Sequence, residues 1–255
     1  LYLPIMVYAG QLSQLNSADS LLKALFVDGT FYHLWYLPAS ITGILVLLAL
    51  SRVSQQKWGI SAAAVTLLYL IGLGGDTYYG LLSQNGYIQR FYEGIFTFSS
   101  YTRNGIFFAP AFLLLGAAVR RKKYRFSPGV CAMGFAGSLA LMFLEGGITY
   151  GLGWQRHNSM YLALPAVMLF FFEGLMHIRG KALPMLPPVS MWIYILHPIC
   201  IIAVRGAAKV LGMTKLLVEN SLVHYLAVCA LSLLVSIAAE CAVRRGAALL
   251  PLLQK

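Results

Sequence analysis

Long apolar runs with almost no charge inside them are the feature that most constrains this chain. A helix needs about 20 such residues to cross a bilayer. Seven runs of this kind occupy residues 32–50, 60–80, 105–119, 129–149, 160–178, 189–204 and 222–243, and residues 1–9 resemble the end of an eighth. Because lipid offers no partner to free backbone polar groups, only helices and closed barrels span it. We therefore predict an all-α, polytopic transmembrane helical bundle that forms a single domain over residues 1–255.

The composition agrees with a membrane protein. Apolar residues make up 59% of the 255 residues and charged residues only 11%, whereas a soluble domain carries about 25% charged residues. This balance excludes a soluble enzyme, a nucleic-acid-binding module and a disordered chain. The net charge of +11 is then a matter of membrane topology, so we expect a lipid bilayer and no nucleic acid as partner.

The positions of the basic residues predict the orientation of the bundle. If the seven spans alternate, twelve of the nineteen Lys and Arg residues fall in the connections and tail of one side. The positive-inside rule makes that side cytoplasmic, which predicts a multi-pass protein of the cell membrane with a cytoplasmic C-terminus. Leu1 lies inside an apolar run with no Met or basic stretch before it, so we expect the chain to be a fragment. In the first outer connection, Ser17 is expected to cap an amphipathic segment that carries Leu21, Leu22, Leu25 and Phe26.

Ionisable side chains at membrane depth are costly and therefore mark candidate functional positions. With this orientation, the ones that fall near the outer leaflet are His33, Asp76, Arg103, Glu145, Arg156, His157 and Arg205. Arg103 and Arg205 could instead extend to the interface, and Arg156 and His157 could be loop residues in water. The side chains of Asp76 and Glu145 are too short for that. We expect the group to line a cavity that opens to the outside.

The sixth run carries a histidine in its middle. His197 shares one helical face with Tyr194 and Arg205. Pro198 removes a backbone donor and should leave the Tyr194 carbonyl without its usual partner. Pro38, Pro110 and Pro165 are predicted to act in the same way, freeing the carbonyls of Leu34, Ile106 and Tyr161 and kinking their helices.

The other polar residues of the predicted spans are interpreted as structural and not as parts of a functional site. Glu173 with His177, and Glu240 with Arg244, are spaced as pairs on one helical face. The four cysteines lie in apolar segments without metal-ligand spacing, so no metal site is predicted.

Several of these residues also stand in motifs of a known family. The segments "FYHLWYLPA" (31–39), "TRNGIFFAPAFLLLGA" (102–117), "SMYLALP" (159–165) and "WIYILHP" (192–198) resemble the acyltransferase-3 family in content and order. Together with "YLIGLGGDTYYGL" (69–81), they resemble most the membrane domain of membrane-bound serine racemases of the VanT type, which accompany D-Ala-D-Ser vancomycin resistance.

The resemblance implies a bundle of about ten spans, of which this chain would hold the third to the tenth. The catalytic Arg and His of the family are usually on its first helix, outside this chain. In the racemase branch, a covalently linked cytosolic racemase domain that uses pyridoxal phosphate (PLP) follows the last span, and the membrane domain is thought to take up L-serine for it. No cofactor is expected in this chain itself, apart from acyl-CoA if the chain is an acyltransferase.

Three functions remain open at this stage. The first is a module that binds and transports a small amino acid, L-serine, through His33, Asp76, Arg103, Glu145, Tyr194, His197 and Arg205. The second is an extracytoplasmic O-acyltransferase with a cytoplasmic acyl donor, in which His33 or His197 would be the general base and the basic loop 120–125 would hold the phosphates of acyl-CoA. The third is a membrane anchor for the racemase.

Overall fold

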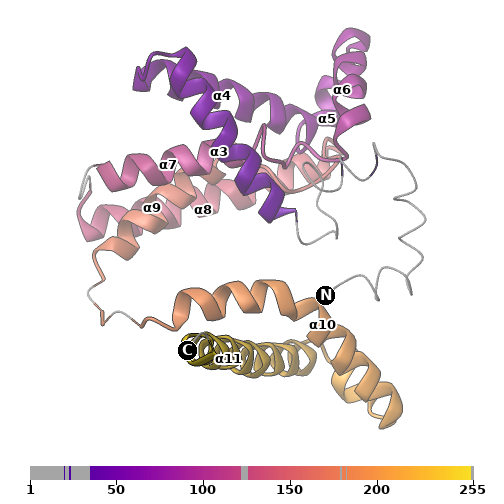
Figure 1. Ribbon diagram of the computed structural model, residues 1–255. Helices are drawn as coiled ribbons and strands as arrows, with labels where there is room; N and C mark the ends of the chain where they lie inside the picture. Colours follow the sequence, from indigo (N-terminus) through magenta and orange to yellow (C-terminus); the bar gives the residue numbers. More distant parts are fainter. Residues whose placement is uncertain are drawn as a thin grey trace. The chain divides into compact units, whose positions relative to one another are not determined.

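The structure is a computed structural model that describes Ser20, Lys23 and residues 35–121, 126–178, 180–181 and 183–253 (Figure 1). The chain divides into two compact units, residues 1–179 and residues 180–255. The first unit contains α3 (Tyr36–Val53), α4 (Trp58–Gly75), α5 (Tyr79–Leu82), α6 (Gly86–Phe98), α7 (Ala109–Arg121), α8 (Pro128–Gly151) and α9 (Leu164–Met176). The second contains α10 (Leu186–Val210), the short π-helix η3 (Lys215–Glu219) and α11 (Ser221–Leu253).

The predicted all-α class is confirmed for the described residues, which contain helices and no strand. Each of the seven predicted spans overlaps one of the helices α3, α4, α7, α8, α9, α10 and α11, with different ends. Five helical stretches in the described part are long and apolar enough to cross a membrane: α3, α4, α8, α10 and residues Ser221–Arg245 of α11. The number of spans, the single-domain organisation and the orientation stay predictions. Residues 1–9, the segment Leu21–Phe26 apart from Lys23, and His33 lie outside the described residues.

Helices α7 and α9 are shorter than their predicted spans. Each has 13 residues, or about 20 Å of helix, against a hydrocarbon core of about 30 Å. The first residues of both predicted spans, 105–108 and 160–163, are turns and irregular backbone. Several of their backbone N–H groups donate instead to the side chains of Asn104, Asp76 and Glu145, as described below.

The prediction that four prolines kink their helices is wrong for three of them. Pro38, Pro110 and Pro165 lie in the first turns of α3, α7 and α9. A proline there lacks only an N–H that would have no partner within the helix, so it starts the helix without bending it. Pro198 alone among the four lies inside its helix, α10.

Small residues let α3 and the start of α7 approach closely. A Cβ added at Gly43 would lie 2.8 Å from the Ala109 Cβ, and one added at Gly105 would lie 2.5 Å from the Thr42 Cβ and 2.8 Å from the Ala39 carbonyl oxygen. Membrane helices commonly pack through such small residues. The crossing brings the residues that precede α7 next to the start of α3.

Helix α6 lies in the connection between the second and third predicted spans, for which no helix was predicted or excluded. The Asn85 side chain starts it by accepting the N–H groups of Tyr87 and Ile88. Tyr92 and Ile95 are buried against Phe107, and the Tyr92 hydroxyl donates to the Ile71 carbonyl of α4 (2.9 Å). This amphipathic helix therefore packs on the end of α4.

The crossing of α3 and α7 yields a stability prediction. Gly105→Ala places a methyl group against Thr42 and the Ala39 carbonyl, and such overpacking costs about 1–3 kcal/mol. The matched control is Gly137→Ala in α8, where a Cβ meets nothing within 4 Å. Thermal unfolding of the purified protein in detergent should show a lower Tm for Gly105→Ala and an unchanged or higher Tm for Gly137→Ala. Equal Tm values would contradict the close approach.

Candidate functional site

Asp76 holds the irregular segment that precedes α9. It follows the last residue of α4 and is fully buried. Its Oδ1 accepts the backbone N–H groups of Ser159 (2.8 Å) and Met160 (3.0 Å). The adjacent Thr77 hydroxyl lies within hydrogen-bonding reach of both this oxygen and the Met160 carbonyl. One carboxylate oxygen thus satisfies backbone donors that no helix can satisfy.

Glu145 of α8 holds the same segment a few residues further on. Its Oε1 accepts the Leu162 N–H (2.6 Å) and the Tyr78 hydroxyl (2.8 Å), and its Oε2 accepts the Ala163 N–H (3.1 Å). A carboxylate is favourable here because the N-terminus of α9 carries partial positive charge. Burial and the bond to Glu145 raise the pKa of Tyr78 to about 12; a phenol is protonated at neutral pH in any case, so its hydroxyl donates to the Glu145 carboxylate.

The second oxygen of Asp76 differs from the first. Oδ2 is buried and has no hydrogen-bond partner among the described residues. Burial raises the pKa of the Asp76 carboxyl, against the opposing effect of its three hydrogen bonds and the nearby His157. A buried carboxylate oxygen without a partner is costly, and such atoms mark functional candidates.

Arg103 stands before α7 with its guanidinium group on aromatic rings. Its Cζ lies 4.4 Å from the centre of the Trp35 ring and 5.8 Å from that of Tyr101. The Nε atom is buried and makes no hydrogen bond within the described part of the chain. Asn104 shapes this turn: its Oδ1 accepts the N–H groups of Ile106 (2.9 Å) and Phe107 (3.0 Å).

Arg156 and His157 belong to the irregular segment that precedes α9, and both lie close to residues already described. The Arg156 N–H donates to the Asp76 carbonyl (3.1 Å), and the His157 ring lies 4.6 Å from the Tyr101 ring. Burial lowers the pKa of His157; the Asp76 charge raises it, and those of Arg156 and Arg103 lower it further. The structure therefore brings together a group that we call the arginine–aspartate cluster: Asp76, Tyr101, Arg103, Arg156 and His157.

The predicted outer residues of the first unit thus lie together where they are described. Asp76, Arg103, Arg156 and His157 belong to the cluster, and Glu145 binds the same segment as Asp76. The positioning roles of Ser159, Met160 and Asn104 were missed, because backbone N–H groups and turn residues leave little signal in one sequence. Whether any of these residues binds a substrate stays a prediction.

The candidates of the second unit form a separate group on α10. The His197 Nδ1 lies 2.9 Å from the Tyr194 carbonyl oxygen and 3.1 Å from that of Ile193. A carbonyl can only accept, so Nδ1 carries the proton, and the bond replaces the donor that Pro198 removes from Tyr194. Arg205 is exposed and lies within α10, which continues to Val210, so it does not close that span as predicted.

The residues of the two predicted helical pairs, Glu240 with Arg244 and Glu173 with His177, have structural roles. Glu240 forms an ion pair with Arg244 (2.7 Å) and accepts the Trp192 Nε1–H (3.2 Å), which joins α10 to α11. The His177 Nε2 bonds to the Phe126 carbonyl (2.9 Å), and Glu173 is buried. The four cysteines are free thiols. The described residues contain no group of three or more side chains suited to hold a metal ion.

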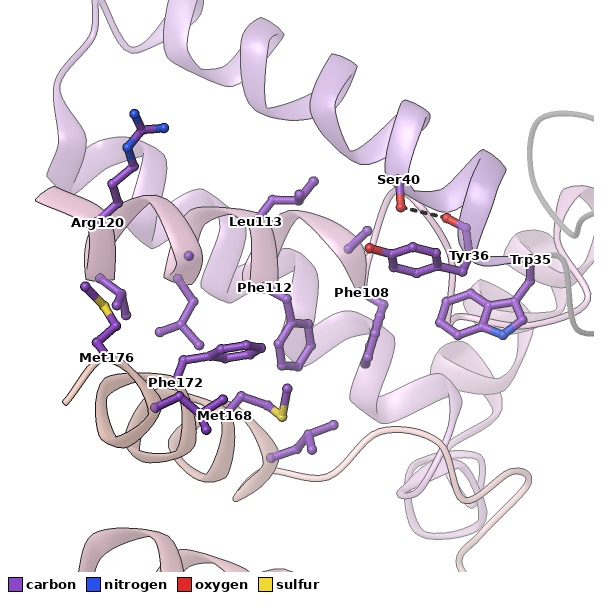
Figure 2. Close-up of a pocket in the computed structure, with 16 residues that line it drawn as sticks. Trp35, Tyr36, Ser40, Phe108, Phe112, Leu113, Arg120, Met168, Phe172 and Met176 are labelled. Carbon is purple, nitrogen blue, oxygen red and sulfur yellow. Dashed lines mark hydrogen bonds between the residues drawn. The ribbon is translucent and has the colours of Figure 1, made fainter. Parts of the chain in front are cut away.

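An apolar cavity of about 740 Å³ lies between α3, α7 and α9 (Figure 2). Phe108, Phe112 and Phe172 line its length, Trp35 lies at one end and Arg120 at the other. Trp35 is also the ring that carries Arg103, so the cavity ends beside the arginine–aspartate cluster. This cavity was not predicted from the sequence, although the i, i+4 spacing of Phe108 with Phe112 and of Met168 with Phe172 is a signal for such aromatic and apolar stripes.

The long apolar helices, and the irregular backbone between them that side-chain carboxylates hold by hydrogen bonds, define a multi-pass helical membrane protein. More specifically, the chain belongs to the acyltransferase-3 family: the family model Acyl_transf_3, described as an acyltransferase domain, matches residues 1–241. The family resemblance drawn from the sequence motifs is thereby confirmed.

Named relatives point to the racemase branch of this family. The chain is 38% identical over 248 residues to a protein of Enterococcus faecalis named amino-acid racemase, covering 93% of this chain and 33% of that protein. It is 37% identical over 235 residues to a serine/alanine racemase of Enterococcus gallinarum, covering 91% and 32%. The chain spans about a third of the length of these curated relatives. No solved structure matches it.

The role of Asp76 in holding the segment can be separated from its charge. Asp76→Asn keeps an oxygen that accepts from Ser159 and Met160, so its Tm should stay near the wild-type value. Asp76→Ala leaves two buried N–H groups unpaired, at about 1–3 kcal/mol each, and its Tm should fall. Thermal unfolding in detergent measures both variants. An equal decrease of Tm in Asp76→Asn and Asp76→Ala would contradict the hydrogen bonds from Ser159 and Met160.

Proposed function

We propose that this chain is the membrane domain of a serine racemase and that it binds and takes up L-serine for a racemase domain on the same polypeptide. The names of the relatives and the share of their length that the chain covers support this. In this proposal the C-terminus is cytoplasmic and leads into the racemase domain, where PLP would be bound. The D-serine produced would serve cell-wall precursors of the kind that lower vancomycin binding.

One observation carries the proposal: the arginine–aspartate cluster offers two opposite charges, each with a buried polar atom that has no hydrogen-bond partner among the described residues. A zwitterionic amino acid needs an anion for its ammonium group and a cation for its carboxylate. The Asp76 Oδ2 could accept from the ammonium group and the Arg103 Nε could donate to the carboxylate, because both atoms are buried and have no hydrogen-bond partner among the described residues. In the proposed complex, Asp76 binds the ammonium group, Arg103 binds the carboxylate, and His157 or Tyr101 contacts the serine hydroxyl.

The discontinuous helices support the same assignment. Helices α7 and α9 both begin next to the cluster, after irregular backbone. In many transporters, broken helices place their N-termini and free backbone groups around a small substrate within the membrane. Glu145, which binds the N-terminus of α9, would hold this arrangement in place. His33, Tyr194, His197 and Arg205 remain proposed contributors to the site.

Uptake by the full-length polypeptide in proteoliposomes tests this function. Asp76→Asn and Arg103→Gln each remove one charge that the substrate needs, and a charged hydrogen bond contributes about 1.5–3 kcal/mol, so uptake of labelled L-serine at low concentration should fall about tenfold or more. Arg90→Gln, on the exposed side of α6, is the control and should transport normally. Unchanged uptake in both site variants would overturn the site.

The apolar cavity favours a second candidate function. An extracytoplasmic O-acyltransferase needs a path for an acyl chain, and the cavity runs from Arg120 to the Trp35 ring beside Arg103. In this alternative, Arg120 and the basic residues after it bind the phosphates of acyl-CoA. A histidine, His33 or His197, then takes the proton from the acceptor hydroxyl. A purely anchoring role would require neither the cavity nor the buried Asp76 and Arg103 atoms that lack a partner among the described residues.

Filling the cavity distinguishes the two functions. Gly116 lines it and has open space around an added Cβ, so Gly116→Phe should occupy the cavity without a clash. If the chain is an acyltransferase, acyl-CoA turnover by the full-length protein should fall severalfold, while Gly137→Phe in α8 should leave it unchanged. L-serine uptake should be unaffected by either change. Absence of acyl-CoA turnover in the wild type would contradict the second function.

A further inference from the structure

Helix α6 has three distinct faces. At about 100° per residue, Ile88, Tyr92, Ile95 and Phe96 form one face, and these are the residues that pack on α4, α5 and Phe107. The polar residues Gln89, Arg90, Glu93 and Thr97 form a second face. Tyr87, Phe91 and Phe98 fall within an arc of about 40° between the other two, and we call them the aromatic face.

The aromatic face is exposed in spite of its composition. Tyr87 is 86% exposed, Phe91 53% and Phe98 43%. The polar face is also exposed and is ordered by a hydrogen bond from the Gln89 amide to Glu93 (2.9 Å). Three aromatic rings on one side and charged groups on the other give two exposed faces with opposite preferences for water.

The position of α6 explains the pattern. It follows the end of α4, a helix long and apolar enough to cross a membrane, and runs crosswise to it (Figure 1). With 13 residues, including Arg90 and Glu93, it is too short and polar to be a span. An amphipathic helix lying across the end of a spanning helix is placed along the membrane surface.

We propose that α6 lies in the bilayer surface and inserts Tyr87, Phe91 and Phe98 among the lipid headgroups and the first acyl carbons. Tyrosine suits this depth because its ring is apolar and its hydroxyl reaches water. The polar face then points to water, and the third face holds α6 on the bundle. This interaction is independent of what the protein transports or transfers.

The surface helix also contacts the arginine–aspartate cluster. The Arg156 guanidinium lies 3.5 Å from the centre of the Phe96 ring, and its Nη1 donates to the Ser100 carbonyl (3.3 Å) just after α6. Anchoring α6 in the lipid surface thus fixes one wall of the cluster at the depth of the headgroups, within reach of water-soluble substrates.

Depth-dependent quenching tests the proposal. Single cysteines at Tyr87, Phe91, Gln89 and Glu93, in a full-length protein whose four native cysteines are replaced, are labelled with an environment-sensitive fluorophore. The protein is reconstituted in phosphatidylethanolamine and phosphatidylglycerol vesicles that contain doxyl-labelled phosphatidylcholine. The labels at 87 and 91 should be quenched by the doxyl lipid at least about twofold more than those at 89 and 93, and aqueous iodide should show the reverse order.

Two results would overturn the proposal. Strong iodide quenching at all four positions would place α6 in water, and protection of positions 87 and 91 from both quenchers would mean that protein covers the aromatic face. Phe91→Trp, with Glu93→Trp as control, keeps every native cysteine and repeats the comparison with brominated lipid. This second pair answers the question even if the cysteine replacements unfold the protein.

Discussion

Two carboxylates that bind backbone N–H groups, those of the buried Asp76 and the half-buried Glu145, determine the form of the first unit. Asp76 and Glu145 together accept four backbone donors of the segment 159–163. Within a membrane, irregular backbone persists only where protein groups satisfy it. Without these bonds the segment would be more stable as an N-terminal extension of α9. The turn that carries Arg156 and His157 would then lose its position. The short α9, the cluster and the end of the cavity all depend on this interaction.

The same arrangement explains how structural and functional demands coexist in one acidic residue. Asp76 uses Oδ1 to hold the chain, and its Oδ2 has no hydrogen-bond partner in the part of the chain that the structure describes. Arg103 is held by stacking on Trp35 and Tyr101, an interaction of the ring face with the cation, and its buried Nε makes no bond among the described residues. Each charge is thus positioned by one part of its side chain while another part is available to a ligand. This division is the physical basis of the proposed amino-acid site.

Much of the candidate site was predictable because charges are rare in this chain. In an apolar sequence, Asp76, Arg103 and Glu145 stand out, and the alternation of spans predicted that they share one level. Their partners were not predictable. The backbone N–H groups of Ser159 and Met160 have no signature in the sequence, and the choice between helix and turn after Asn104 depends on contacts with α3. The prolines show the same limit: their local effect is known, but whether Pro110 and Pro165 start or bend a helix depends on where the helix begins.

The sequence by itself determined the class of the protein, since apolar runs can avoid unpaired backbone groups in lipid only by forming helices. It also determined the family, through motifs that survive in order along the chain. The tertiary structure decided where α7 and α9 begin, that α6 exists as a helix with an exposed aromatic face, and that an apolar cavity ends beside Arg103. These features arise from hydrogen bonds and packing between residues far apart in the chain, such as Asp76 and Met160, which are 84 positions apart, and such long-range partners are specified by the fold alone.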